Sequence, residues 1–329
     1  MNPNPSHLQL PESGAECVTL PNGLTIIVKE DHSAPVASVQ AWVKTGSIHE
    51  GEWMGAGLSH ILEHMLFKGT RRRSGNQIAQ EIQDVGGYIN AYTSFDRTVY
   101  WVDTPSSGAG VAIDVLADVL TQATLPEDEY ESEQEVIRRE FAMGNDDPDR
   151  THAELMFRTV FRDHPFGQPV IGHLEIFDQL KRDDVLDYYK RHYVPNNQFF
   201  VIVGDIDTAQ VVARLRSAYA EIPRCPYQKA SVQQEQQQLG RREAHEEFVT
   251  EVTKLSMAWR VPDLTHPDVP ALDVLAAILG QGRSARLYRS IREQQQLVTS
   301  IGAYCYTPTD SGIFCITAEM EPEKRAEVQ

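Results

Sequence analysis

Two histidines and a glutamate occur within one short stretch, His60-Ile-Leu-Glu63-His64. If this stretch is a helix, His60 and His64 are four residues apart, and their imidazoles leave the same face about one turn apart. Such a pair is a two-point chelate for a divalent metal, and zinc is the usual metal in sites of nitrogen and carboxylate ligands. Glu63 cannot easily share the ion with both histidines, but it can reach a water molecule on it. The order H-x-x-E-H reverses H-E-x-x-H and is itself a metallopeptidase signature.

The residues around this stretch are strongly apolar. They are Leu58, Ile61, Leu62, Met65, Leu66 and Phe67. A helix that is apolar almost all round is expected to be buried, and three ionisable groups in a buried helix need a partner. The competing interpretation is two partly buried histidines beside a surface glutamate, because a short motif is only a hypothesis. The apolar surroundings favour the metal site.

A third protein ligand is needed, because a catalytic zinc typically has three protein ligands and one open position. The acid-rich segment 127–143 is expected to be a helix. At about 100° per residue, Glu133 and Glu140 share one face of this helix, and that face is apolar. Glu131 points the opposite way, and Glu135 lies well off the face. Either Glu133 or Glu140 is therefore expected as the ligand, the alternative being an acid paired with a neighbouring arginine.

The elements that must position these groups come in blocks. Apolar alternation predicts strands over residues 17–20, 24–29, 36–44, 88–94, 98–103 and 198–204. Helical patterns are found over residues 58–67, 76–85, 111–123, 127–143, 151–161, 182–193 and 209–219, with Ser74 as the expected N-cap of the second. Blocks of strands and helices, rather than strict alternation, indicate an α+β fold.

A glutamine-rich segment, 226–246, divides the chain. After it, the start of the first unit is repeated as a strand, two helices and a hairpin, expected over residues 251–259, 270–279, 285–295, 299–306 and 312–318. We predict a zinc-bearing domain over residues 1–225, a linker over 226–246 and a partial second domain over 247–329. Both domains are expected to be α/β sandwiches, each with helices on one side of an antiparallel sheet. Because the second has too few helices to cover its sheet, we expect the natural protein to continue beyond residue 329.

Composition excludes several classes of protein. The net charge of −17 argues against a nucleic-acid partner, whose binding protein would be basic. No run of eighteen apolar residues is present, so no membrane span is expected. The polar stretch Met1–Gly14 has no apolar core typical of a leader, which predicts a cytoplasmic protein, or a periplasmic one if a leader has been trimmed. The four cysteines form no C-x-x-C pair and are too few for a disulfide scaffold.

Several blocks, in order along nearly the whole chain, resemble the pitrilysin/insulinase family of inverted-zincin metallopeptidases, which includes the mitochondrial processing peptidases. They are HILEHMLFKGT from His60, GGYINAYT from Gly86, EQEVIRRE from Glu133, HPFG from His164 with VIG from Val170, and YVPNN from Tyr193 followed by VGD. The resemblance implies that Glu140 is the third zinc ligand, that Glu133 supports a ligand from behind, and that Glu63 is the general base.

The same resemblance implies how a peptide is bound. The strand over residues 87–93 is similar to an edge strand to which the substrate adds as a further strand, pairing with the backbone of Asn90 and Ala91. Phe67 and Tyr92 are similar to aromatic residues that line the pocket just after the scissile bond. Ordinary core packing is the alternative for both rings.

Family members build a closed chamber from two halves, of which only one carries zinc. The other half contributes an arginine and a tyrosine seven residues apart; here Arg292 matches the arginine, but Thr299 stands in place of the tyrosine. The resemblance therefore implies a zinc endopeptidase for short or unfolded polypeptides that needs a second homologous half. That half is either fused C-terminally or a separate subunit, including a second copy of the chain. The alternative function is a non-catalytic scaffold or assembly subunit.

Overall fold

The computed structural model describes residues 14–328, so the stretch in which no leader is predicted lies almost wholly outside the described residues. Six described strands form the first sheet, in the order β1 (Glu16–Thr19), β2 (Thr25–Glu30), β6 (Gln198–Gly204), β3 (Val36–Val43), β5 (Thr98–Pro105), β4 (Tyr88–Thr93). Neighbouring strands are antiparallel except β2 and β6, which are parallel. Strand β4 lies at one edge of the sheet.

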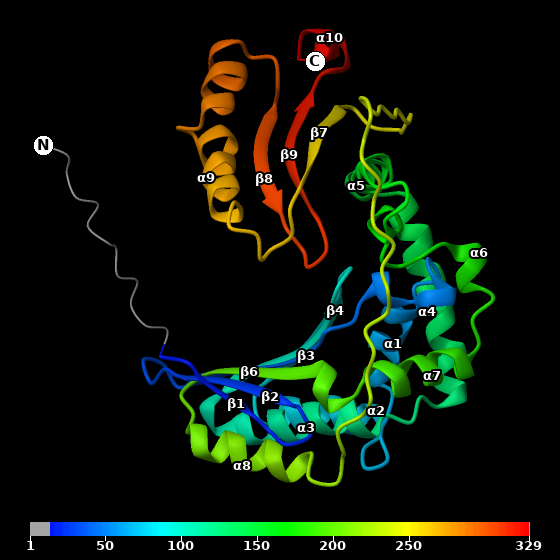
Figure 1. The fold of residues 1–329 in the computed structure, drawn as a ribbon, viewed down its shortest axis with the longest axis vertical. Coiled ribbons are helices and arrows are strands. Elements are labelled where there is room, and N and C mark those ends of the chain that lie inside the picture. The colour runs from blue at the N-terminus through cyan, green and yellow to red at the C-terminus, as the bar shows by residue number, and fades with distance from the viewer. Residues whose placement is uncertain (1–13, 329) are drawn as a thin grey trace, which may run out of the picture.

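Helices cover one face of this sheet. The α-helices of this part are α1 (Leu58–Leu66), α2 (Gly75–Asp84), α3 (Ala109–Gln122), α4 (Glu127–Asn145), α5 (Pro148–Val160), α6 (Leu174–Phe177), α7 (Arg182–His192) and α8 (Thr208–Ala218). Helices α3 and α8 lie side by side beneath the sheet (Figure 1). The sequence of strand β3 explains why one face of the sheet is covered. Its buried residues, Ala37, Val39, Ala41 and Val43, alternate with more exposed ones, so one face of the strand is apolar and packs against the helices. The predicted α+β fold, with helices packed on one side of a sheet, is confirmed.

A second, smaller sheet follows. It contains β7 (Thr253–Val261), β9 (Gly312–Met320) and β8 (Ser300–Tyr306), in that order and antiparallel, with α9 (Val269–Gly280) packed against β8. The order β7-β9-β8 matches the order β3-β5-β4 in the first sheet. The last described element is the short helix α10 (Arg325–Val328). The helix predicted over residues 285–295 forms a π-helix over Tyr288–Gln294, with wider five-residue hydrogen bonds such as Gln295 N to Ser290 O.

The glutamine-rich segment lies between these two parts, since no helix or strand is assigned between α8 and β7 among the described residues. Figure 1 shows it running as an extended strap beside the first part towards α5. Glu235 anchors it, because one carboxylate oxygen accepts hydrogen bonds from the backbone N–H groups of Arg162, Asp163 and His164. Within residues 14–328, no helix is long and apolar enough to cross a membrane.

Candidate metal centre

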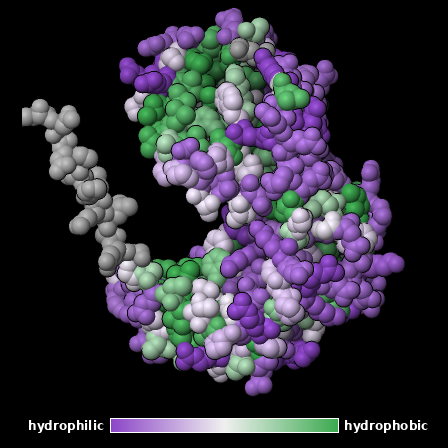
Figure 2. Space-filling view, viewed as in Figure 1, coloured by the Kyte–Doolittle hydropathy of each residue, from purple (hydrophilic) through white to green (hydrophobic). Residues whose placement is uncertain are grey.

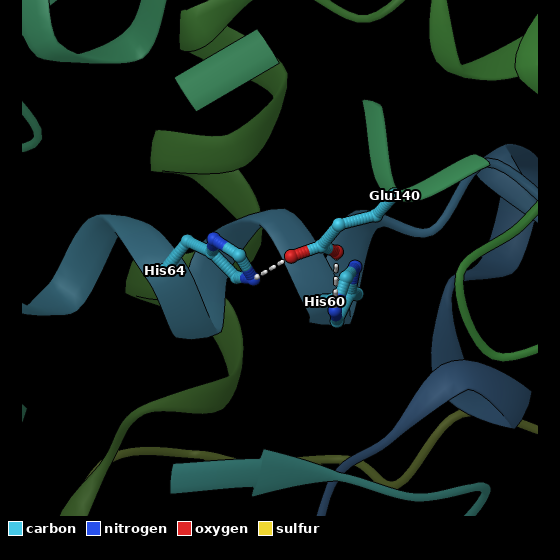
Figure 3. A group of neighbouring side chains, drawn as sticks. All are labelled: His60, His64 and Glu140. Carbon is cyan, nitrogen blue, oxygen red and sulfur yellow. Dashed lines mark ion pairs between the residues drawn. The ribbon is translucent and has the colours of Figure 1, made fainter. Parts of the chain in front are cut away.

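Helices α1 and α4 bring three metal-binding side chains together. His60 and His64 come from α1 and Glu140 from α4, and one donor atom of each lies within 4.8 Å of the others (Figure 3). His60 Nε2 is 3.6 Å from Glu140 Oε2, and His64 Nε2 is 3.8 Å from Glu140 Oε1. Two ligands of a tetrahedral zinc ion lie about 3.3 Å apart. These two histidines and one carboxylate therefore fit zinc in both chemistry and spacing.

Glu133 lies behind the group rather than in it. Its Oε2 accepts a hydrogen bond from His64 Nδ1 at 2.9 Å, and its Oε1 forms an ion pair with Lys68. A histidine that donates Nδ1–H to a carboxylate presents the lone pair of Nε2 on its other side, where Glu140 lies. Between the two acids that share a helix face, the geometry thus places Glu140 among the donors and Glu133 as the support of His64.

The electrostatics differ at the two histidines. Burial lowers the pKa of His60 to about 3, and the neighbouring His64 adds to this effect. His60 is therefore neutral at pH 7, the form that can bind a metal. Burial also opposes protonation of His64, but its hydrogen bond to Glu133 and the nearby carboxylate of Glu140 outweigh burial and raise its pKa. A cation at this position, whether a proton or a metal ion, is favoured by the surrounding carboxylates.

Glu63 projects from the same helix towards the edge strand. The hydroxyl of Thr93, the last residue of β4, donates a hydrogen bond to Glu63 Oε2 at 2.5 Å. Burial raises the pKa of Glu63, while this hydrogen bond opposes the shift. A carboxylate with a raised pKa is a stronger base than an ordinary glutamate. The Glu63 carboxylate, with its raised pKa, is thus held at the end of β4, on the same helix as His60 and His64.

The residues predicted to bind substrate fall in two places. On β4, Asn90 and Tyr92 have exposed side chains, whereas Ala91 points towards the core. Phe67, at the C-cap of α1, packs its ring 5.7 Å from that of Tyr100 and also lines a pocket of about 710 Å³ with Ile89. Tyr92 does not line that pocket, but faces the guanidinium of Arg97 at 5.9 Å. The structure thus separates the two aromatic residues.

Sequence reasoning did not identify Glu50, which anchors the start of α1. This buried carboxylate accepts hydrogen bonds from the N–H groups of Gly57 at 3.1 Å and Ser59 at 2.9 Å. Gly57 has a φ of 72°, and a Cβ there would lie 1.9 Å from the carbonyl oxygen of Ile171, so only glycine fits. The sequence does contain a signal for such a residue. Helix α1 follows Gly57 and has no Ser, Thr, Asp or Asn cap, so another side chain must accept the hydrogen bonds of its first N–H groups.

A family model described as insulinase (peptidase family M16) matches residues 25–173, and a model described as the peptidase M16 inactive domain matches residues 179–329. An uncharacterized zinc protease of Mycobacterium leprae is 33% identical over 318 residues, covering 94% of this chain and 70% of the relative. The chain belongs to the insulinase family. Its predicted membership, and with it the general character of a zinc protease-like hydrolase, is thereby confirmed.

Further relatives and solved structures resemble the chain over most of its length. An uncharacterized zinc protease of Rickettsia felis is 30% identical over 308 residues, covering 93% of this chain and 73% of the relative. The crystal structure of a protease from Helicobacter pylori has a TM-score of 0.88 at 26% identity, over 95% of this chain and 76% of that one. An M16 inactive-domain structure from Pseudomonas fluorescens, at 20% identity and a TM-score of 0.84, covers 94% and 75% and supports the fold alone.

Replacing Glu50 by glutamine is expected to change how stability depends on pH. Burial raises the pKa of Glu50 from the ordinary value of 4.5 to about 7. Because the pKa of Glu50 is raised in the folded state, the unfolded chain loses this proton at a lower pH than the folded protein does. The free energy of unfolding therefore falls as pH rises from about 4.5 to about 7. The wild type should therefore lose about 2–3 kcal/mol more than Glu50→Gln between pH 5 and pH 8.

Urea unfolding of both proteins at the two pH values measures this difference. Glu52→Gln, which changes an exposed acid of the same loop, is the control and should follow the wild type. Parallel stability curves for wild type and Glu50→Gln would show that Glu50 keeps an ordinary pKa.

Replacing Glu133 by glutamine is expected to weaken zinc binding about 10–100-fold, the range typical of losing a carboxylate behind a metal-binding histidine. The amide keeps the size of the side chain but removes the charge that faces His64 and Lys68. Competition with a chromogenic chelator measures the zinc affinity. Glu131→Gln, on the exposed side of α4, should leave it unchanged, and unaltered affinity in Glu133→Gln would remove Glu133 from the site.

Proposed function

We propose that this protein is a zinc-dependent endopeptidase that holds one zinc ion per chain with His60, His64 and Glu140. The observation that carries the proposal is the convergence of these three donors beside Glu63, whose carboxylate lies at the end of an edge strand. A zinc ion held there supplies a Lewis acid that polarises a peptide carbonyl and makes a water molecule more acidic. The zinc protease names of the relatives support the same choice of metal.

The residues of the chain perform the proton transfers and hold the substrate. Glu63 takes a proton from the attacking water and passes it to the leaving amine as the C–N bond breaks. The peptide lies extended along β4 and pairs with the backbone of Asn90 and Ala91, because no described strand covers the outer edge of β4. The N–H of Ala91 donates to Asn90 Oδ1 at 2.8 Å, so the Asn90 side chain must turn away before this N–H can bind the peptide. Phe67 contacts the substrate side chain just after the scissile bond, and the exposed ring of Tyr92 lies on β4 beside the bound peptide.

A second homologous half is part of the proposal. Figure 2 shows that the molecule is hollowed between the first part and the second sheet, a shape that a second half would close into a chamber for short or unfolded polypeptides. Arg292 donates a hydrogen bond to Tyr288 within its own helix at 2.6 Å, and Thr299 stands where the family resemblance asks for a tyrosine. The half that supplies the missing groups is fused, a separate subunit or a second copy. The division into 1–225, 226–246 and 247–329 is part of this proposal.

The test is cleavage of a quenched fluorescent peptide by the protein at its full native length, with its partner half where that is separate. Cleavage should stop on treatment with a chelator and return when stoichiometric zinc is added. An unfolded polypeptide should be cut, whereas the same sequence in a folded domain should resist. A preparation that binds no zinc, or cleavage that survives chelation, would overturn the proposal. A zinc-bound protein without peptidase activity would instead support the alternative of a scaffold subunit.

A further inference from the structure

The end of strand β4 is where a bound peptide would meet the candidate base. Thr93 closes the strand and donates its hydroxyl to Glu63 Oε2. Residues 94–97 then form the turn to β5, which the hydrogen bond from Ser94 N to Arg97 O closes at 2.8 Å. The position of this turn therefore sets the position of the peptide relative to Glu63.

The turn is held from two sides by the first part of the chain. The N–H groups of Ser47 and Ile48, in the segment that leads to α1, donate to the carbonyls of Ser94 and Phe95 at 3.2 and 3.0 Å. The ring of Phe95 packs 5.2 Å from that of Phe157 and 4.9 Å from that of Phe166. Asp96 and the Ser94 hydroxyl of this turn take no part in these contacts and remain available to another segment of the chain.

The third side is held by the second sheet. The turn between β8 and β9 reaches across, and Thr309 N donates to Asp96 Oδ2 at 3.0 Å although the two residues are 213 positions apart. Tyr306, the last residue of β8, places its hydroxyl 3.4 Å from Ser94 Oγ and its ring 6.4 Å from that of Phe95. Contact between the two sheets is thus made at the turn that ends the proposed substrate strand.

Asp96 connects these contacts with strand β4. It is 7% exposed, and while Oδ2 accepts from Thr309, Oδ1 accepts from Arg97 Nη1 at 2.8 Å. The guanidinium of Arg97 lies 5.9 Å from the ring centres of both Tyr92 and Trp42. Both carboxylate oxygens of Asp96 therefore accept a hydrogen bond, one from the second sheet and one from Arg97, whose guanidinium packs on Tyr92.

We propose that Asp96 is a positioning residue, which holds the catalytic end of β4 in place by tying the β4–β5 turn to the β8–β9 turn. This inference rests on the proposed peptidase function. Its consequence is that the second sheet, which supplies no zinc ligand among the described residues, sets the alignment of the peptide with Glu63. Such alignment matters because a displacement of about 1 Å can cost about 100-fold in rate.

Asp96→Ala tests this role. The variant should keep one zinc ion per chain, because no donor is touched, but lose about 100-fold in kcat/KM, mostly in kcat. Without substrate, the backbone amides of residues 91–97 should exchange with deuterium at least about tenfold faster than in the wild type, since their turn has lost one anchor. Asp96→Asn keeps an acceptor for Thr309 N–H and should restore part of both losses.

Two further variants separate positioning from general loosening. Asp149→Ala breaks the 2.7 Å ion pair between Asp149 of α5 and Lys254 of β7, another link between the two parts. Asp149 lies in the first turn of α5, whereas Phe157, which packs on Phe95, lies near the other end of that helix. It should leave exchange over residues 91–97 and kcat unchanged. Thr309→Pro removes the N–H group that donates a hydrogen bond to Asp96. The double variant of Asp96→Ala and Thr309→Pro should lose no more kcat, and exchange no faster over residues 91–97, than Asp96→Ala alone.

Wild-type exchange rates over residues 91–97 in Asp96→Ala would overturn the proposal, and so would equal effects of Asp149→Ala. If the wild-type protein cleaves no peptide, the proposed function fails, but the exchange measurement still decides whether Asp96 holds β4.

Discussion

Glu63→Gln is expected to lower kcat for peptide cleavage by about 10³-fold while the protein keeps one zinc ion per chain. Glutamine has nearly the same size and still accepts the hydrogen bond from Thr93, but it cannot take a proton from water. Zinc stays because Glu63 is not among the three donors, which are His60, His64 and Glu140. Metal analysis of the purified variant, together with single-turnover cleavage of the quenched peptide, measures both quantities.

Glu52→Gln is a suitable control, because it removes one exposed negative charge from the loop before α1 and should keep full activity. Near wild-type cleavage by Glu63→Gln would mean that another group transfers the proton. Loss of zinc from this variant would instead show that Glu63 is a ligand and that the separation of binding from proton transfer is wrong.

Glu140→Gln is expected to raise the dissociation constant for zinc by more than about 100-fold. Removal of a carboxylate behind a metal-bound histidine already costs about 10–100-fold, and Glu140 is placed to touch the ion itself. A neutral amide oxygen is a weaker zinc ligand than a carboxylate, and the two histidines alone leave the coordination incomplete. Chelator competition measures the affinity, and activity should recover only partly when zinc is added in excess.

The matched control for this variant is Glu131→Gln on the same helix, whose side chain is exposed. Circular dichroism should show that both variants remain folded, because Glu140 is itself partly exposed. Unchanged zinc affinity in Glu140→Gln would exclude it as the third ligand and return the choice to Glu133.

Local pattern was sufficient for much of this molecule. The four-residue spacing places His60 and His64 on one helix face whatever surrounds them, and they indeed lie together. Ser74 is the N-cap of α2, as expected, and accepts from Gln77 N in a capping box. The alternation in β3 identifies its buried face in the same way. These features depend on residues a few positions apart, whose relation the backbone geometry sets.

The choice between Glu133 and Glu140 needed the tertiary structure. The two acids share a face of α4 but lie about 10 Å apart along its axis. Only the crossing of α4 over α1 decides which of them is level with both Nε2 atoms and which lies behind His64. Their order along one helix contains no information about that crossing, and the family resemblance, rather than the helical pattern, pointed to Glu140.

The pair of histidines, the family and the order of strands and helices could all be predicted from the residue pattern, because each follows from periodicity or from matching blocks. Only the tertiary structure revealed Thr93 on Glu63, Glu50 under the first turn of α1, and Asp96 against Thr309. The partners in these contacts are up to 213 positions apart. Such contacts exist because packed sheets and helices bring distant backbone and side-chain groups together, where a buried polar group must find a partner.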